Sequence, residues 1–451
     1  MDKLFGSSGV RGIVNSFLTP EKACSVGLAV ASYSQAKKAI IGRDTRFSGL
    51  MLQEALISGL ISCGVDVKIL GIVPTPVVAY LTKELGANIG FMLTASHNPA
   101  QYNGIKIFDE NGISYSDEQQ QSIEKKIQDK NYRLANWKNV GKCTEIDDTY
   151  LYIEKVKKIT NLQKRWNIIV DPGCGATYSV GPKLLKTSGC KVTVLNAQPD
   201  GNFPARPSEP TKKILRNLAQ IVKALGSDIG IAFDGDGDRV AFIDKDGKFA
   251  DFDRVLAAFM GYVLQKNGGG TVVTNVEASM CFEKIAKRHN GKIIRTKVGD
   301  VYLSEAIKKN NAIFGGEPCG AWIHPQVHYC PDGPLSATLL LKALEEKKIT
   351  LNEFISEVPK FITLRENIHC SNKIKTKIVK IIEEKMKNVF PSLIESSIVD
   401  GPRISLENGW ILIRASGTEP IIRLTVEGES LKIANSILER GVKLIKENIE
   451  V

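Results

Sequence analysis

Long apolar runs are missing from this sequence. No uninterrupted apolar stretch of about 18 residues occurs in its 451 residues, which excludes a membrane-spanning helix of the usual length. The N-terminal residues also lack a basic region followed by a long apolar stretch. We therefore expect no secretory signal peptide and a cytoplasmic location.

Paired cysteines and several common catalytic patterns are missing as well. The nine cysteines are scattered and form no Cys-x-x-Cys pair, which is typical of reduced core thiols. There is no Gly-x-Ser-x-Gly elbow and no Gly-x-x-x-x-Gly-Lys-Ser/Thr loop. Gly173 and Gly175 follow a predicted strand, but Tyr178 occupies the third glycine position of a dinucleotide-binding turn. We therefore expect no dinucleotide site.

Basic residues are in excess, with a formal net charge of +11. Such a balance favours anionic partners, which include nucleic acid, membrane surfaces and phosphorylated metabolites. The basic residues are spread along the chain, and the densest runs, such as residues 155–158, alternate with apolar residues. This pattern favours solvated helix faces over a nucleic-acid patch.

A strand–helix–strand pattern occurs three times. The copies run from residues 39–44 to 64–70, from 167–171 to 189–195, and from 271–275 to 291–295. In each copy a β-branched run, a polar turn and a helix-length segment lead to a glycine that ends the helix and to a second apolar run. Because parallel strands need such a crossover helix, the pattern predicts three related α/β domains.

The C-terminal part has a different pattern. Apolar segments at 411–413 and 421–426 precede a helical run at 431–449, which predicts a smaller α+β domain. The fold class is therefore α/β with mixed sheets, and the expected domains span residues 1–140, 150–248, 250–360 and 362–451.

Three carboxylates alternate with glycines directly after an apolar run at 229–233. Asp234, Asp236 and Asp238 can face one point in an extended or looped backbone, and a hard divalent cation would relieve their repulsion. An EF-hand calcium loop is excluded, because Arg239 and Lys245 occupy its glycine and glutamate positions. Three carboxylates leave room for Mg²⁺ to share a phosphate. An acidic surface turn is the alternative, although the run ends a predicted buried strand.

Ser96 follows the apolar run 89–93 and is surrounded by small and turn-forming residues. A serine at a strand end is a candidate exposed nucleophile. His97 is adjacent, but sequence neighbours rarely face each other, so we expect no serine hydrolase couple. Taken alone, the segment is equally compatible with a structural turn.

A second candidate anion site lies near the C-terminus. Arg414, the hydroxyls of Ser416 and Thr418, and the flexible Gly417 supply donors that can converge on a phosphate dianion. A plain hairpin between two strands is the alternative interpretation.

Taken together, the loops around Ser96 and Asp234 resemble those of the α-D-phosphohexomutase family. Residues 5–12 are similar to the family's N-terminal motif, residues 316–320 stand in place of its sugar-recognition loop, and residues 414–420 are similar to its phosphate-binding loop. The stretches occur in family order and cover nearly the whole chain. The resemblance implies four domains around a central cleft. It also implies interconversion of hexose 6-phosphates and 1-phosphates through a phosphoserine and a bisphosphorylated sugar.

The resemblance also implies a role for each site residue. The Mg²⁺ ligands would be Ser96, which carries the phosphoryl group, with Asp234, Asp236 and Asp238. The residues near the reacting phosphate would be Arg11, His97, Lys106 and Arg239. Substrate would be bound by Glu317 and Cys319 at the sugar, and by Arg414, Ser416, Gly417 and Thr418 at the other phosphate.

Three residues depart from the family pattern. Cys319 replaces a common Ser, Ala321 a common His, and Val301 a common basic residue. Because that histidine is often credited with acid/base help, we expect Lys106 to be the base, with a pKa lowered by burial and neighbours. His324 and His328 could substitute, or could be structural.

The sugar-recognition stretch, residues 316–322, is more similar to archaeal members tied to amino-sugar phosphates than to mannose/glucose mutases or the usual bacterial glucosamine form. We therefore predict that a small sugar phosphate is the partner and that glucosamine 6-phosphate is converted to glucosamine 1-phosphate. Mannose or glucose phosphate is the alternative substrate. A sugar-phosphate phosphatase and a non-catalytic sugar-phosphate sensor are alternatives of other classes. The oligomeric state is not predicted.

Overall fold

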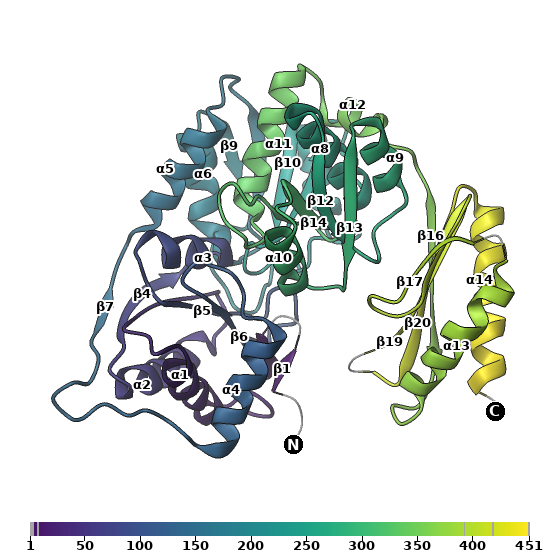
Figure 1. Cartoon of the computed structure of the whole chain (residues 1–451). Coiled ribbons are helices and arrows are strands. Elements are labelled where there is room, and N and C mark those ends of the chain that lie inside the picture. Colours follow the sequence, from purple (N-terminus) through teal and green to yellow (C-terminus); the bar gives the residue numbers. More distant parts are fainter. Residues whose placement is uncertain (1–3, 7–8, 392, 417–418, 450–451) are drawn as a thin grey trace. The chain divides into compact units, whose positions relative to one another are not determined.

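The chain divides into two units, each built from two separate segments. Unit 1 contains residues 1–252 and 299–355, and unit 2 contains residues 253–298 and 356–451. The computed structural model describes residues 4–6, 9–391, 393–416 and 419–449 (Figure 1). Each unit is described separately below.

A seven-stranded mixed sheet forms the N-terminal part of unit 1. In spatial order its strands are β1 (Phe5–Gly6), β2 (Gly9–Ile13), β6 (Tyr102–Phe108), β5 (Ile89–Leu93), β3 (Lys38–Arg43), β4 (Asp66–Ile72) and β7 (Cys143–Glu145). One face is covered by α1 (Pro20–Ser34), α2 (Gly49–Ser62) and α4 (Asp117–Asp129), and the other by α3 (Thr75–Glu84) (Figure 1). Because both faces are covered, β5 is buried at every position.

Unit 1 also contains a four-stranded sheet. Its strands, in spatial order, are β11 (Val240–Asp244), β10 (Ile229–Phe233), β8 (Asn167–Asp171) and β9 (Lys191–Val194). The strands β8, β9 and β10 are parallel, and β10 and β11 form an antiparallel hairpin. The helical segments of this region are α5 (Thr149–Thr160), η1 (Ala176–Tyr178), α6 (Val180–Thr187) and α7 (Arg216–Ala224).

The second segment of unit 1 supplies a short hairpin and its flanking helices. These elements are α10 (Asp300–Lys309), β14 (Phe314–Glu317), β15 (Ala321–Ile323) and α11 (Gly333–Lys347), followed by α12 (Leu351–Ser356). Val327, Cys330 and Leu335 join Tyr80 and Tyr152 in one apolar cluster, so this segment completes the core of unit 1.

Unit 2 combines a parallel strand pair with an antiparallel sheet. The first part consists of α8 (Phe252–Asn267), β12 (Gly270–Asn275), α9 (Cys281–Arg288) and β13 (Gly291–Thr296). The antiparallel sheet has the order β16 (Ile362–His369), β20 (Ile421–Gly428), β19 (Gly409–Ala415), β18 (Arg403–Leu406) and β17 (Leu393–Ser397). The helices α13 (Lys375–Val389) and α14 (Leu431–Ile449) pack on it through one apolar cluster.

The fold class predicted from the sequence is confirmed. Each of the three repeats forms two parallel strands joined by a helix, and the C-terminal part is α+β. The predicted glycine stop is correct in the first two copies, where Gly64 and Gly189 have φ of 76° and 90°. It is wrong in the third, where Asn290 takes the left-handed position at φ 53° and Gly291 already begins β13.

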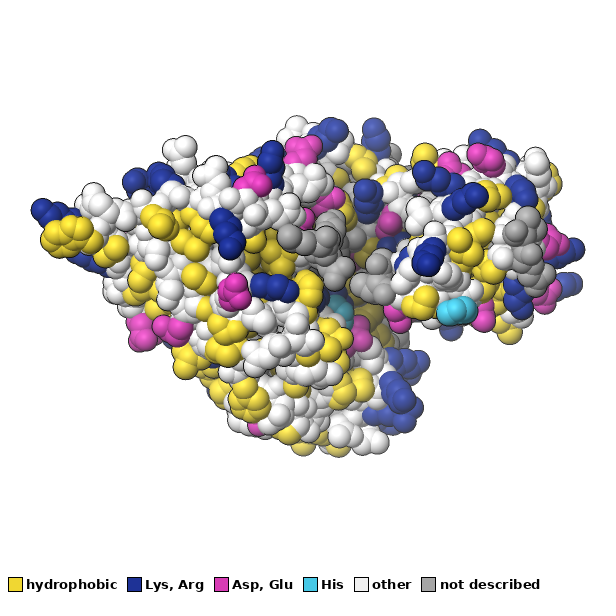
Figure 2. Space-filling model, turned by 90° about the horizontal axis from the view of Figure 1, so that it is seen from below, with side chains coloured by type: hydrophobic (Ala, Val, Ile, Leu, Met, Phe, Trp, Pro, Cys, Tyr) yellow, Lys and Arg dark blue, Asp and Glu magenta, His cyan; other side chains and the backbone are white. Residues whose placement is uncertain are grey.

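The surface view (Figure 2) shows how charged side chains are distributed on one face of the molecule. Figure 2 shows lysine and arginine side chains in small groups among acidic and uncharged ones on the face in view. Within the described part of the chain, no helix has both the length and the apolar character that crossing a membrane requires.

Candidate active site

Ser96 lies beyond the carboxyl end of β5, in the loop that leads to β6. Its side chain is 3% exposed and its backbone is left-handed at φ 48°, which is uncommon for a residue with a side chain. The Ser96 N–H donates to Thr94 Oγ1 at 2.8 Å, which fixes this conformation. The Ser96 hydroxyl donates to Asp234 Oδ2 at 2.8 Å. The two most distinctive loops of the sequence therefore meet at these two side chains.

His97 also faces the serine. Its Nδ1 lies 3.2 Å from Ser96 Oγ, so the expectation that the two neighbours point apart is wrong. The left-handed backbone of Ser96 departs from the extended geometry in which successive side chains alternate. Burial, and then the nearby cations Arg239 and Arg11, lower the pKa of His97 to about 3. The ring is therefore neutral near pH 7 and is a weak proton acceptor.

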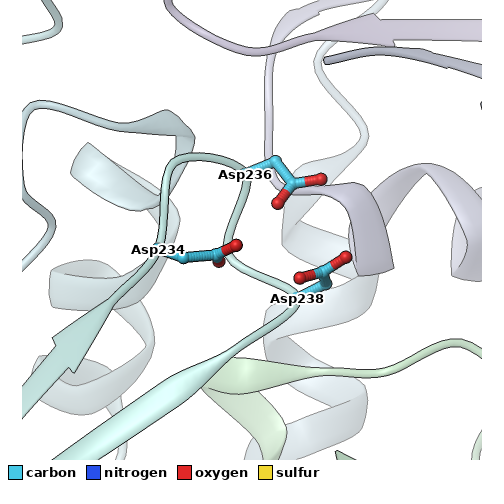
Figure 3. A group of neighbouring side chains, drawn as sticks. All are labelled: Asp234, Asp236 and Asp238. Carbon is cyan, nitrogen blue, oxygen red and sulfur yellow. The ribbon is translucent and has the colours of Figure 1, made fainter. Parts of the chain in front are cut away.

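The three alternating aspartates lie in the hairpin loop between β10 and β11. Asp234 and Asp236 are fully buried and Asp238 is 6% exposed. Each offers a carboxylate oxygen that lies within 4.8 Å of the others. Figure 3 shows the three side chains near one another around this loop. The predicted convergence of the three carboxylates is therefore present in the structure.

Two oxygens of this cluster lack a hydrogen-bond partner. Asp236 Oδ1 and Asp238 Oδ1 are buried and accept no hydrogen bond from the described residues. A buried anionic oxygen without a partner is costly, and a hard divalent cation with oxygen ligands removes that cost. Burial, and then Asp238 and Asp236, also raise the pKa of Asp234 well above its usual value. The set of three converging carboxylate oxygens fits Mg²⁺.

Lys106, on β6, is ion-paired with the aspartate cluster. Its Nζ lies 3.2 Å from Asp236 Oδ2 and 2.5 Å from Asp238 Oδ2. Burial alone would lower the pKa of Lys106, but the two carboxylates outweigh it and raise the pKa above its usual value. The expected pKa depression of Lys106 is therefore wrong, because its neighbours are anions. In this arrangement Lys106 is a buried cation that is ion-paired with both carboxylates.

Two arginines flank the same cluster. Arg11, on β2, donates from Nη1 to Asn98 Oδ1 at 3.0 Å, in the loop that carries Ser96. Arg239 directly follows the aspartates, and its Nε lies 4.0 Å from Asp238 Oδ1. Both cations therefore lie beside the site where the sequence predicts a reacting phosphate.

The predicted sugar-recognition residues lie in the same unit. Glu317, at the end of β14, is buried and its Oε1 accepts the Gly299 N–H at 2.9 Å. The backbone N–H of Val240 donates to Gly320 O at 3.0 Å, which ties this hairpin to the aspartate loop. Burial raises the pKa of the Cys319 thiol to about 12, so the thiol is a neutral group.

The histidines beyond Ala321 are built into the packing of unit 1. His324 Nε2 lies 2.9 Å from Ser336 Oγ, and burial, followed by His328, lowers its pKa to about 3. His328 Nε2 lies 2.8 Å from Asp332 Oδ2, and its Nδ1 accepts the Cys330 N–H at 3.2 Å. These contacts support the structural alternative for both histidines.

The predicted phosphate loop is described in part. Arg414, near the end of β19, is ion-paired with Glu277 through Nη1. Its Nη2 lies 2.7 Å from Asp400 Oδ2. Ser416 Oγ accepts the Glu419 N–H at 3.1 Å. Gly417 and Thr418 lie outside the described residues. These predicted residues belong to unit 2, whereas the other predicted site residues belong to unit 1.

Sequence reasoning missed two buried ion pairs next to the catalytic loops. Asp44 pairs with Arg46, and Asp171 pairs with Arg206, at N–O distances of 3.0 and 2.9 Å. The available signal was an aspartate at the carboxyl end of the first strand in each of the first two repeats, where parallel sheets place functional residues.

Four domain profiles of one family match the chain in sequence order. They are those of the phosphoglucomutase/phosphomannomutase alpha/beta/alpha domains I, II and III and the C-terminal domain, which match residues 2–133, 150–247, 251–361 and 366–444.

Full-length relatives and solved structures agree with this match. The phosphoglucosamine mutases of Methanococcus vannielii and Methanocaldococcus jannaschii are 43% and 41% identical to the chain, and each comparison covers 99% of both sequences. A phosphoglucomutase/phosphomannomutase family protein of Burkholderia thailandensis has a similar structure, with a TM-score of 0.90 and 26% identity. That comparison covers 99% of this chain and 97% of the other.

Proposed function

This chain belongs to the phosphoglucomutase/phosphomannomutase family and is a phosphomutase, and from this premise we propose that it converts glucosamine 6-phosphate to glucosamine 1-phosphate. The names of the two archaeal relatives, which match over nearly their whole length, support glucosamine as the sugar. The sugar-recognition stretch at residues 316–322 supports the same choice.

The reaction consists of two phosphoryl transfers through Ser96. In the first, the bond between phosphorus and Ser96 Oγ breaks, and a bond forms between phosphorus and the free hydroxyl oxygen of the sugar monophosphate. The proton lost by that hydroxyl is balanced by the proton that Ser96 Oγ gains. The resulting bisphosphorylated sugar turns in the site and returns its other phosphoryl group to Ser96 by the same steps in reverse.

The residues of the chain orient and neutralise the reacting groups. Asp234 Oδ2 accepts the Ser96 hydroxyl at 2.8 Å and so directs Oγ toward the aspartate cluster. Lys106 and Arg239 supply fixed positive charge beside the transferred group, where charge develops in the transition state. The aspartates and the Ser96 oxygen would hold Mg²⁺, which when bound supplies further positive charge to the phosphoryl oxygens.

The remaining predicted residues bind the rest of the substrate in this proposal. Arg11 and His97 border the reacting phosphate. The sugar hydroxyls contact Glu317 and Cys319. The phosphate that does not react is held by Arg414, Ser416, Gly417 and Thr418.

The observation that carries the proposal is the hydrogen bond between Ser96 Oγ and Asp234, beside two buried carboxylate oxygens that accept no hydrogen bond from the described residues. The test is a panel of glucosamine, mannose and glucose 6-phosphates with Mg²⁺, followed by phosphorus NMR. We expect the 1-phosphate of glucosamine to form with a kcat/KM at least about tenfold above those of the other two sugars. The Ser96→Ala variant in the same assay is the control.

Each other outcome contradicts a defined part of the proposal. A higher kcat/KM with mannose or glucose phosphate would overturn the sugar assignment and leave the mutase reaction. Release of inorganic phosphate without an isomeric product would indicate a phosphatase. Binding of sugar phosphate with no turnover, and with no phosphate on Ser96, would indicate a sensor.

A further inference from the structure

We propose that two buried pairs, Asp44–Arg46 and Asp171–Arg206, are equivalent backbone clamps that set the distance between Ser96 and Asp234. Neither arginine touches the hydroxyl or the three aspartates of the site. Arg46 instead donates to four backbone carbonyl groups of the Ser96 loop, and Arg206 donates to the carbonyl of Phe233, the residue directly before Asp234. The expected effect on phosphoryl transfer rests on the proposed phosphomutase function. The expected effect on the position of the two loops does not.

Arg46 holds the loop that carries Ser96. The guanidinium is 1% exposed and uses all five of its N–H donors. Nε donates to Asp44 Oδ2 at 3.0 Å. The other four bonds go to backbone oxygens of the loop: Ser96 at 2.9 Å, Asn98 at 2.7 Å, Pro99 at 2.6 Å and Tyr102 at 2.8 Å. A single planar group thus determines the path of the loop from Ser96 to the start of β6.

Asp44 extends this clamp to the serine's own backbone. Its Oδ2 also accepts the Thr94 hydroxyl at 2.7 Å, and Thr94 Oγ1 accepts the Ser96 N–H at 2.8 Å. The peptide groups on both sides of the Ser96 side chain are therefore fixed, the N–H through Thr94 and the carbonyl through Arg46. This double restraint keeps Ser96 in its left-handed conformation.

Arg206 holds the end of β10, directly before the loop that carries the aspartates. The residue is 7% exposed, and its Nε donates to Asp171 Oδ2 at 2.9 Å. Its Nη2 donates to Phe233 O at 2.7 Å and to Asp171 O at 3.1 Å. Since Phe233 directly precedes Asp234, this bond fixes the point at which the aspartate loop leaves β10.

The two clamps occupy equivalent places in the first two repeats. Asp44 directly follows β3, and Asp171 is the last residue of β8; both strands are the first of their repeat. The strand β3 pairs in parallel with β5, which leads to Ser96, and β8 pairs in parallel with β10, which leads to Asp234. In both sheets the aspartate–arginine pair therefore lies beside the strand end that carries the reacting side chain.

The two clamped loops touch each other directly. Ser208, two residues after Arg206, donates from Oγ to Asn98 O at 3.3 Å, and the same oxygen accepts Arg46 Nη2. A Cβ added to Gly235 would lie only 2.5 Å from Ser96 O, so the backbones are in close contact. A shift in either clamp would therefore change the separation of Ser96 Oγ and Asp234.

The test is a pair of lysine substitutions with two separate readouts on the full-length protein. Lysine keeps the charge and loses the planar fork of donors. In Arg46→Lys we expect the phosphorylation of Ser96 by a hexose 1,6-bisphosphate to slow about 100-fold. This rate is measured in a single turnover from the intact mass of the protein. The KM should stay within about threefold of the wild-type value. In Arg206→Lys we expect the Mn²⁺ dissociation constant, measured by EPR, to rise about tenfold. Because Ser96 is only one of the proposed ligands, Arg46→Lys should raise this constant less than Arg206→Lys does.

Arg403→Lys is the matched control, because Arg403 is also a buried arginine that bonds to a backbone oxygen and a hydroxyl, but in unit 2. It should lower the urea midpoint and leave both readouts unchanged. If Arg46→Lys and Arg206→Lys change the two readouts only as Arg403→Lys does, the clamps are merely structural and the inference is overturned.

Two further results keep the test decisive. If either lysine variant fails to fold, Asp44→Asn and Asp171→Asn replace them with the same expected directions, and unchanged readouts in these variants overturn the inference. If the wild-type protein turns over no sugar phosphate, the proposed function fails. The Mn²⁺ measurement then still decides whether Arg206 positions the aspartate loop.

Discussion

Ser96 combines a reactive side chain with a buried and restrained backbone. The Ser96→Ala variant removes the only oxygen that can carry the phosphoryl group in the proposed reaction. We expect turnover to fall by several orders of magnitude, while the urea unfolding curve stays close to that of the wild type. Steady-state assays of the purified variant measure the loss. Near-wild-type turnover would contradict the assignment of Ser96.

The aspartate cluster makes activity dependent on a divalent cation. One oxygen each of Asp236 and Asp238 is buried without a hydrogen bond, and the carboxylates of Asp234, Asp236 and Asp238 lie within reach of a single ion. Exhaustive chelation should abolish turnover, and Mg²⁺ should restore it more fully than Ca²⁺, because a compact site with few carboxylates suits the smaller ion. Full activity after chelation would rule out the metal site.

His324 should make the protein less stable in mild acid. Burial, and then His328, lower the pKa of His324 from its ordinary 6.5 to about 3 in the folded state. Between these values the unfolded chain binds the extra proton. Stability therefore falls as pH falls, by up to about 1.4 kcal/mol per pH unit for one such group.

Urea unfolding at about pH 7 and about pH 5 tests this linkage. The loss of stability between the two pH values should be smaller in His324→Gln than in the wild type. The control is His369→Gln, which changes an exposed histidine. Equal losses in wild type and His324→Gln would show that His324 does not titrate differently on unfolding.

The sequence predicted the convergence of the three aspartates better than it predicted the electrostatics around them. The alternating aspartates and Ser96 were recognisable because their loops end apolar runs. The direction of the pKa shift of Lys106 was not recognisable, because it depends on whether the lysine on β6 faces anions or apolar groups. The orientation of His97 was missed because the left-handed φ of Ser96 is set by tertiary bonds and not by a local signal.

At the scale of elements, the start of α11 is a buried polar junction. Asp332 is the N-cap of this helix and accepts the Leu335 N–H at 2.8 Å, the Tyr152 hydroxyl at 2.7 Å and His328 Nε2 at 2.8 Å. Asp332→Ala leaves these donors buried without an acceptor, which should cost about 3–5 kcal/mol of unfolding free energy.

Ser116→Ala is the matched comparison, because Ser116 caps α4 in a capping box with Gln119 at a more exposed position. Its loss should cost only about 1 kcal/mol. Urea unfolding of both variants measures the difference. Equal costs would mean that burial adds nothing to the cap of α11.

The elements themselves were largely predictable where the pattern was periodic. The helical run at 431–449 matches α14 at both ends, and all three strand–helix–strand repeats are present. The strands β16 to β18 were not predicted. In β17, for example, every residue is partly or fully exposed. Its sequence therefore lacks the alternation of apolar and polar residues that marks a half-buried strand.

At the scale of the whole molecule, Arg414 separates substrate binding from chemistry. Its proposed role is to hold the phosphate that does not react, and lysine cannot reproduce its two-pronged geometry. Charge-assisted bonds to phosphate are worth about 1.5–3 kcal/mol each, so Arg414→Lys should raise KM roughly ten- to a hundred-fold. Because Arg414 lies in unit 2, Mg²⁺ affinity and the phosphate occupancy of Ser96 in unit 1 should change little.

Steady-state kinetics and analysis of released sugars test this assignment. More bisphosphorylated sugar should escape from the Arg414→Lys variant, because the loop helps to retain it. A large fall in kcat with an unchanged KM would mean that Arg414 does not hold the distal phosphate.

The division of each unit into two chain segments has a consequence for biosynthesis. Residues 1–252 are synthesised before the second segment of unit 1. They therefore lack Val327, Cys330 and Leu335, which belong to the core that packs around Tyr80 and Tyr152. The backbone N–H of Val240, the first residue of β11, has no acceptor until Gly320 has been synthesised. A nascent chain stalled near residue 252 should therefore expose apolar surface and unpaired backbone. The apolar cluster around Tyr80 and Tyr152 can therefore be completed only after residue 335 has left the exit tunnel.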